Sequence, residues 1–144
     1  MSRRLLILIL AVVAIVPAVV LFMSRGDRGG EAPGAGIPLG LAQSRAARVS
    51  DLRYAVDVRV PASKSEPVRA TVTATFQLQD ADEALAFDFA QPSDRLLGVT
   101  ANGTPLTPWH ENGHVMIPDD DLVAGGNTIV FEVLAGDAPL NRND

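Results

Sequence analysis

Alternation of apolar and polar residues is the sequence feature that most constrains how this chain folds. Between residues 51 and 60 every second residue is apolar: Leu52, Tyr54, Val56, Val58 and Val60. Successive side chains of a β-strand point to opposite faces, so a period of two predicts a strand with one buried face. Residues 67–79 repeat the period, with mostly threonine and glutamine on the polar face, as strand surfaces favour. We therefore expect two half-buried strands joined by a Pro/Ser-rich loop.

A third strand is expected in the segment 83–91, "EALAFDFAQ". Its alternation places Leu85, Phe87 and Phe89 on the inward face and Asp88 on the outward face. A weak helical pattern covers residues 41–50, ahead of the first strand.

Turn chemistry organises the rest of the chain into short strands. Asn102-Gly103 most readily takes the positive φ angles of a type I′ hairpin turn, and short apolar segments flank it. A last strand is expected within residues 127–136. Short strands at a spacing of roughly ten residues, without a long helical period, predict an all-β fold, an antiparallel β-sandwich or curved sheet.

The N-terminus predicts a membrane anchor. Residues 5–23 form an uninterrupted apolar run, which as a helix would reach roughly 28 Å, close to the ~30 Å hydrocarbon core of a bilayer. No small-residue cleavage site follows the run closely, so an uncleaved signal anchor is favoured over a removed signal peptide. Arg3 and Arg4 precede the run, which favours a cytoplasmic N-terminus and a periplasmic or extracellular body.

Composition then divides the chain into three parts. A predicted anchor at 1–23 is followed by a Gly/Pro-rich segment at 24–44, which we interpret as a flexible linker, and by a β domain at 45–144. The formal net charge of −5 argues against a nucleic-acid partner. The chain has no cysteine, so its stability must come from a hydrophobic core rather than from disulfides.

The stretch "HENGH", residues 110–114, has the spelling of the HExxH zinc motif. Two histidines four residues apart reach one metal only when they lie on one face of a helix. Asn112 and Gly113 are poor helix formers, and Asn-Gly is the preferred centre of a tight hairpin. The sequence therefore predicts a hairpin here.

That hairpin would separate the motif's side chains. Glu111 would lie opposite His114, and His110 opposite Val115, and neighbouring cross-strand pairs point to opposite faces of a sheet. We therefore considered and rejected His110, Glu111 and His114 as metal ligands, and assign no catalytic, cofactor-binding or metal-binding residue in this chain.

Other motifs also have structural interpretations. Asp119 to Asp121 lack the spacing and turn glycine of an EF-hand calcium loop, so we expect a solvated turn. Trp109 and Met116 would face each other in the hairpin and are interpreted as core or interface packing. The chain contains no GxSxG motif and no Gly-rich phosphate loop.

Several strand and turn patterns occur in an order that is known from one family. They are a strand with Tyr54, the "LxFDF" strand at 85–89, the Asn102-Gly103 turn, the "HVxIP" strand at 114–118, and an "LxxGxN" turn at 122–127 that leads into an apolar strand. Over residues 45–144 this order resembles about the first half of the N-terminal domain of M1-family (aminopeptidase N-like) zinc metallopeptidases.

The resemblance implies a domain that packs against a catalytic domain and helps to wall its active-site entrance. The GxMEN segment and the helical HExxH with its distant glutamate are absent from the sequence, so no catalytic residue is carried over. Zinc is expected only in a catalytic domain that these 144 residues do not contain.

The sequence thus predicts the non-catalytic N-terminal β domain of a membrane-anchored M1-type aminopeptidase, as a fragment or a split protein. Its expected partners are the membrane, through residues 5–23, and an M1 catalytic domain, downstream or in trans. The alternative is a stand-alone, membrane-tethered β-sandwich that binds a protein or glycan outside the cell. Zinc hydrolysis through His110 and His114 would need the helix that Asn112 and Gly113 disfavour.

Overall fold

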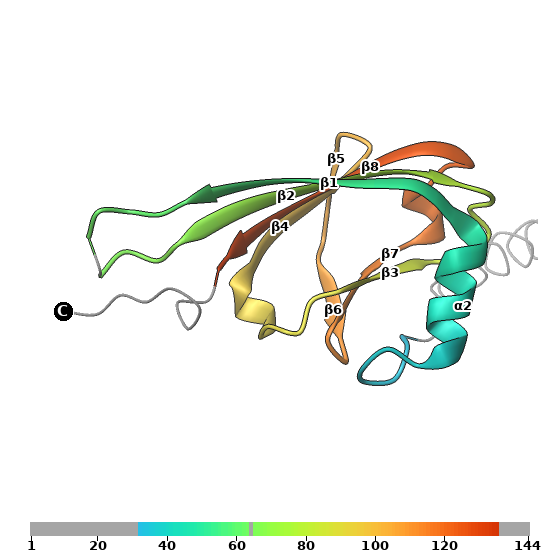
Figure 1. Cartoon of the computed structure of the whole chain (residues 1–144), viewed down its shortest axis with the longest axis horizontal. Coiled ribbons are helices and arrows are strands. Elements are labelled where there is room, and N and C mark those ends of the chain that lie inside the picture. The colour runs from blue at the N-terminus through green and yellow to red at the C-terminus, as the bar shows by residue number, and fades with distance from the viewer. Residues whose placement is uncertain (1–31, 64, 136–144) are drawn as a thin grey trace, which may run out of the picture. The chain divides into compact units, whose positions relative to one another are not determined.

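The computed structural model describes residues 32–63 and 65–135, which form two antiparallel sheets that face each other (Figure 1). The first sheet has the strand order β1-β2-β8-β4-β5, and the second has the order β3-β7-β6. The prediction of an all-β, antiparallel architecture is therefore confirmed for this part of the chain. The predicted anchor at 5–23 lies outside the described residues.

The strands are β1 (Val49–Arg59), β2 (Arg69–Leu78), β3 (Leu85–Asp88), β4 (Leu96–Ala101), β5 (Thr104–Leu106), β6 (Trp109–Glu111), β7 (His114–Ile117) and β8 (Gly125–Leu134). One helix, α2 (Leu39–Arg48), precedes β1, and two short 3-10 turns are η1 (Ser93–Arg95) and η2 (Asp119–Asp121). Within residues 32–63 and 65–135, no helix has the length and apolar character needed to cross a bilayer.

The core lies between the sheets. Ala74, Phe76 and Ile129 come from the first sheet and are at most 3% exposed, and Val115 and Ile117 close the core from the second sheet. The alternation that predicted inward faces in β2 and β8 therefore holds, and these faces are mostly buried, with Val72 partly buried. Three aromatic rings join the two layers, with Phe87 at 6.0 Å from Phe76 and 5.1 Å from Phe131 between ring centroids.

Strand β1 departs from the prediction of a half-buried strand. Its register, Tyr54 opposite Ala74 and Val56 opposite Val72, puts its apolar residues on the core side of the first sheet, as the alternation predicts. These residues are nevertheless 46–60% exposed. The facing sheet has three strands against five, so it covers the central strands and leaves the face of β1 uncovered. The predicted burial of this face is therefore wrong.

Helix α2 begins at Leu39, inside the segment 24–44 that composition predicts to be a flexible linker. Arg45 and Arg48 lie in its last turn, where cations are favoured by the helix dipole. Arg48 also fixes the helix end, because its Nη2 donates to the carbonyl oxygen of Glu83 at 2.8 Å. Contacts to distant loops thus stabilise a helix that local composition signals only weakly.

Both Asn-Gly sequences form the predicted hairpins. Asn102 and Gly103 have φ angles of 50° and 85° between β4 and β5, and Asn112 and Gly113 have φ angles of 52° and 82° between β6 and β7. Positive φ at both central residues is the requirement of a type I′ turn. Local turn chemistry therefore determines both connections.

Candidate functional site: an apolar pocket on the open flank

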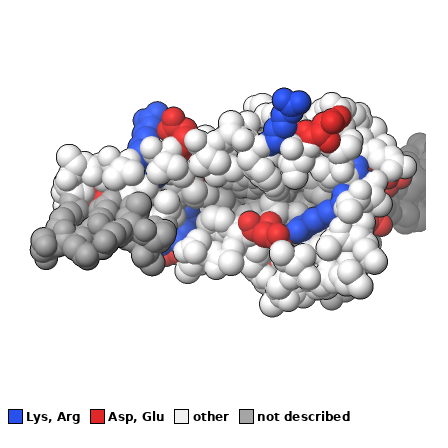
Figure 2. Space-filling model, in the orientation of Figure 1, with Lys and Arg blue, Asp and Glu red and all other residues white. Residues whose placement is uncertain are grey.

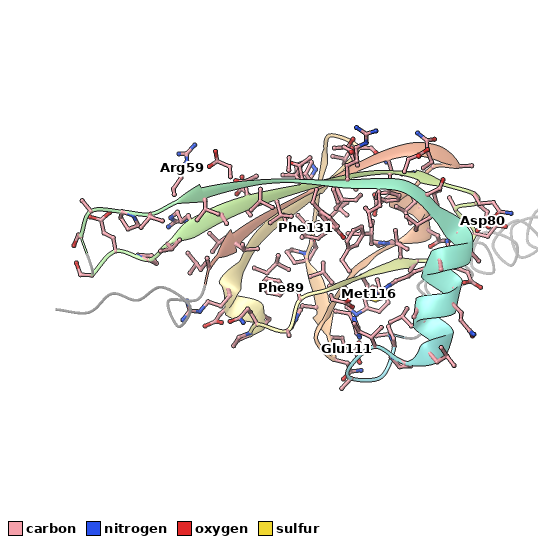
Figure 3. All side chains as sticks on the ribbon, in the orientation of Figure 1. Arg59, Asp80, Phe89, Glu111, Met116 and Phe131 are labelled. Carbon is pink, nitrogen blue, oxygen red and sulfur yellow. The ribbon has the colours of Figure 1, made fainter. Side chains whose placement is uncertain are left out.

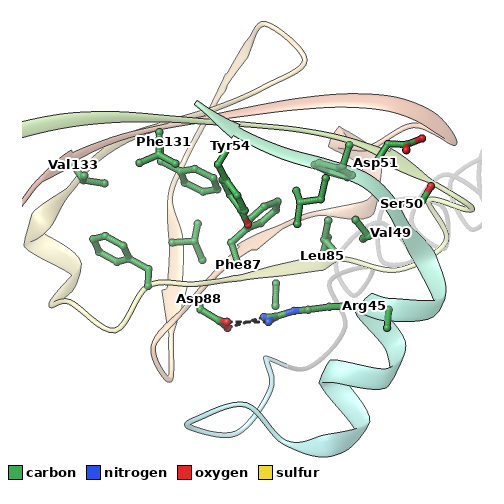
Figure 4. Close-up of a pocket in the computed structure, with 17 residues that line it drawn as sticks. Arg45, Val49, Ser50, Asp51, Tyr54, Leu85, Phe87, Asp88, Phe131 and Val133 are labelled. Atoms are coloured by element: carbon green, nitrogen blue, oxygen red, sulfur yellow. Dashed lines mark hydrogen bonds and ion pairs between the residues drawn. The ribbon is translucent and has the colours of Figure 1, made fainter. Parts of the chain in front are cut away.

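The uncovered face of β1 forms one wall of a pocket of about 510 Å³. The second sheet supplies the opposite wall, mainly through β3, and β8 supplies the floor. In Figure 4, Tyr54 extends from β1 toward Phe87, and Phe131 lies beside them. The lining is predominantly apolar and includes Val49, Leu52, Tyr54, Val72, Phe76, Leu85, Phe87, Phe89, Phe131 and Val133. We call this pocket, together with the exposed apolar face of β1, the open flank.

A charged clamp lies at the helix side of the open flank. Arg45 of α2 donates from Nη2 to Asp88 Oδ1 at 2.9 Å and from Nη1 to Asp88 Oδ2 at 3.1 Å, a two-pronged arrangement that is among the stronger ion-pair geometries. Figure 2 shows the surrounding face as mostly uncharged and hollowed beneath β1. The clamp thus ties the helix to β3 beside an otherwise apolar cavity.

His114 extends this clamp into the interior. Its ring is 2% exposed, with Nδ1 at 3.0 Å from Asp88 Oδ1 and Nε2 at 3.3 Å from the carbonyl oxygen of Gly34. Asn112 makes a parallel contact, because its side-chain amide donates to the carbonyl oxygen of Pro33 at 3.1 Å. These contacts hold residues 33–34 against the second sheet.

The electrostatic effect of the clamp falls on Asp88. The hydrogen bonds from Arg45 lower the pKa of this carboxyl below its ordinary value of 3.8, although partial burial acts in the opposite direction. The positive charge of Arg45 and the contact with His114 lower it further. Asp88 is therefore held in its charged form, which suits a structural anchor rather than a proton donor.

The residues of the HExxH spelling are placed as the hairpin predicts. Glu111 lies opposite His114 and His110 opposite Val115. The two histidines have separate partners, since His110 Nε2 donates to the carbonyl oxygen of Phe89 at 2.9 Å, whereas His114 contacts Asp88. Among the residues that the structure describes, no group of three or more His, Cys, Asp or Glu side chains is arranged to hold a metal ion.

The remaining sequence candidates lie away from the pocket lining. Met116 is buried and pairs with the partly buried Trp109, whose Nε1 donates to Glu111 Oε2 at 3.2 Å, consistent with the expected packing role. Asp119 to Asp121 form the short turn η2. None of these five residues is among those that line the pocket.

Two features of the site were missed by reasoning from sequence. The clamp joins Arg45 to Asp88 across 43 positions and Asp88 to His114 across 26, and no local pattern reports such contacts. The open flank also was not predicted at β1, because alternation gives the direction of a side chain but not the extent of the opposing layer.

In comparisons with known proteins, no protein-family model and no curated protein matches the chain.

Proposed function

We propose that this chain is a non-catalytic β domain that packs against another protein component through its open flank. The observation that carries the proposal is the row of large apolar side chains on β1, each at least 46% exposed, beside a pocket lined by further apolar residues. Contiguous apolar surface of this kind is a mark of interaction sites, because soluble domains otherwise avoid exposing it.

The M1-family resemblance suggests which component this is. In that family the N-terminal β domain packs on the catalytic domain, so shape and a complementary apolar face are what its role requires. On this reading zinc and the catalytic residues belong to that other component. The predicted anchor at 5–23 would hold the domain at the membrane, with the β domain on the periplasmic or extracellular side.

The first test is to read the gene beyond the codon for Asp144. GxMEN and helical HExxH motifs encoded there, in frame or after a frameshift, would support the M1 assignment. If neither motif is encoded there, the assignment to this family is withdrawn.

The second test measures docking directly. If such a region is encoded, it is expressed separately and mixed with the full 144-residue chain. We expect a complex by size-exclusion chromatography that Tyr54→Lys abolishes, because a charge would enter the apolar contact. Thr75→Lys is the matched control, since Thr75 is exposed on the opposite face of β2. Equal binding by both variants would contradict docking through the open flank.

A stand-alone extracytoplasmic binding module is the second candidate, and the pocket itself favours it. A volume of about 510 Å³ lies within the range of roughly 300–1,000 Å³ that small-molecule sites occupy, and the clamp of Arg45 and Asp88 offers polar groups at one end. This candidate expects the isolated chain to be monodisperse and to take up an apolar fluorescent probe with one-to-one stoichiometry. Aggregation of the chain without a partner would count against it.

A further inference from the structure

Four strand edges are exposed in the two sheets as described, and β1 is the longest of them. Strand β1 has 11 residues, whereas β3 has four and β5 and β6 have three each. Strand β5 also carries Pro105, which cannot donate a backbone hydrogen bond. Long edge strands without proline are templates for pairing with another chain. Strand β1 is therefore the edge at which a further strand would add.

We infer that the strand added at this edge is β1 of a second copy of the same chain, paired antiparallel about a two-fold axis at Ala55. The inference rests on the exposed apolar row of β1 that carries the proposed docking function, and it names a second copy of this chain as the partner of the β1 edge. The two five-stranded sheets would then continue into one sheet across the axis.

The charges on the outer face of β1 select this partner. Residues 51–59 read Asp-Leu-Arg-Tyr-Ala-Val-Asp-Val-Arg, so the charged residues alternate between acidic and basic, with two on each side of Ala55. With Ala55 opposite itself, Arg53 faces Asp57 of the second copy, whereas Asp51 lies outside the regular register because the strand is irregular there and its φ angle is 53°. The Arg53–Asp57 pairing occurs twice by symmetry, which places two opposite-charge pairs across the junction.

These charged groups are available for pairing. Asp57 and Arg59 have side chains that are 71% and 86% exposed, and they contact each other only at 3.6 Å along the same strand. Figure 2 shows blue and red side chains gathered in two groups along this strand, and Figure 3 places Arg59 at one of them, directed away from the core. The regular register from Arg53 to Arg59 keeps the strand straight, because the irregularity at Asp51 lies at one end.

Other registers are disfavoured by the same charges. A slip of the axis by one position toward Arg59 places Arg53 opposite Arg59 of the second copy, and a slip the other way leaves Arg53 opposite Ala55 of the second copy. A further slip places Arg53 or Asp57 opposite its own equivalent. Like charges directly opposite each other destabilise a sheet. Registers that pair odd with even positions would set the apolar face against the charged face.

The apolar face fits the same register. Tyr54 would lie opposite Val56 of the second copy, so exposed apolar residues meet at the centre of the junction. Tyr54 lines the pocket beneath β1, and its equivalent from the second copy would extend the pocket wall at the open side. The pairing would therefore bury the sides of Tyr54 and Val56 that point toward the junction, beyond the edge that the three-stranded sheet covers.

The first experiment uses the absence of cysteine in the chain. At a two-fold axis the two copies of residue 55 are directly opposite, with Cα atoms about 4.5–5.5 Å apart, within the range that a disulfide bridges. The full chain carrying Ala55→Cys, solubilised in detergent, should form a disulfide-linked dimer on mild oxidation, seen by non-reducing gel electrophoresis.

The matched control is Thr73→Cys, on the strand next to β1 and directly opposite Ala55. Its two copies would be three strand spacings apart, roughly 14 Å, too far for a disulfide. We expect no dimer from this variant beyond the background from random collision.

The second experiment tests the register through the charges, with Ala55→Cys as the reporter. Adding Arg53→Asp or Asp57→Arg alone places like charges opposite each other and should lower the dimer about ten-fold. The double variant, Arg53→Asp with Asp57→Arg, restores opposite charges and should restore the dimer. Mixing the two single variants should also restore it, because an acidic strand then meets a basic one. Circular dichroism checks that each variant stays folded.

The outcomes separate the inference from the function on which it rests. A monomeric Ala55→Cys variant, or a disulfide-linked dimer that is insensitive to the charge reversals, overturns pairing through β1. A disulfide-linked species whose mass is not twice that of the chain also overturns it and identifies a different partner. In each case the docking test with Tyr54→Lys stands independently, because it measures binding of a different polypeptide to the open flank.

Discussion

Strands β1 and β2 are neighbours with the same alternation in sequence, yet they lie in opposite environments. In β2 the inward residues Ala74, Phe76 and Leu78 are at most 3% exposed, whereas Tyr54, Val56 and Val58 of β1 are 52–60% exposed. Their registers put both sets on the same side of one sheet. The difference teaches that alternation predicts the direction of a side chain, while burial depends on how many strands the opposing layer contributes.

The largest expected effect is the difference in unfolding free energy lost when a side chain is truncated in the buried core and in the open flank. Ile129→Ala removes a fully buried side chain from β8 and should lower the free energy of unfolding by about 2–5 kcal/mol. Val58→Ala removes a half-exposed side chain from β1 and should change it by less than about 0.5 kcal/mol. Urea unfolding of the full chain, followed by the fluorescence of its single tryptophan, Trp109, measures both.

A large loss from Val58→Ala would contradict this contrast. It would mean that Val58 is packed against another surface in solution, as it would be in part beside the β1 junction of a self-paired dimer at high protein concentration. Repeating the Val58→Ala measurement over a range of chain concentrations distinguishes packing within one chain from packing between two chains, because only a loss that depends on association varies with concentration.

A smaller effect is expected when valine is replaced by threonine, which has nearly the same size but is polar, in the core and in the open flank. Val99→Thr buries a hydroxyl in the core side of β4 and should cost about 1–3 kcal/mol, because that site is 3% exposed. Val56→Thr places the same hydroxyl at a position that is 60% exposed, where water satisfies it, and should be nearly neutral. Equal costs at the two positions would show that the sequence pattern alone, and not the opposing layer, sets the environment.

Local chemistry accounts for the parts of the fold that the sequence predicts. The Asn-Gly turns at 102–103 and 112–113 require positive φ, which these residues tolerate, and both hairpins form, the second with the predicted register. Alternation likewise identifies the strands, since it depends only on neighbouring residues. These inferences need no knowledge of what lies across the core.

Long-range contacts account for what the sequence does not reveal. Helix α2 overlaps the weak helical pattern predicted at 41–50, but it begins inside the predicted linker and is held there because Arg45 and Arg48 find acceptors on segments more than 30 positions away. Asp88 reads as an outward strand residue, yet it connects Arg45 to His114. The extent of the smaller sheet also depends on which strands pair, which a single sequence does not specify.

The smallest effect tests the clamp that borders the open flank. The pKa of Asp88 is lowered in the folded state, so its stabilising contribution is fully present above the ordinary value of 3.8 and is lost as the pH falls through the folded pKa. Because the Asp88 side chain is 45% exposed, solvent screening reduces the contribution, and we expect about 1 kcal/mol.

Urea unfolding of the full chain between about pH 5 and about pH 2 should therefore show a steeper acid loss for the unmodified chain than for Asp88→Asn. Asp82→Asn is the matched control, because Asp82 is an exposed carboxylate in the loop between β2 and β3 and is not part of the clamp, and its replacement should leave the steeper acid loss of the unmodified chain in place. If Asp88→Asn and the unmodified chain lose stability in parallel, Arg45 and His114 do not stabilise the charged carboxylate, and α2 is held at the flank by its apolar contacts and by Arg48 instead.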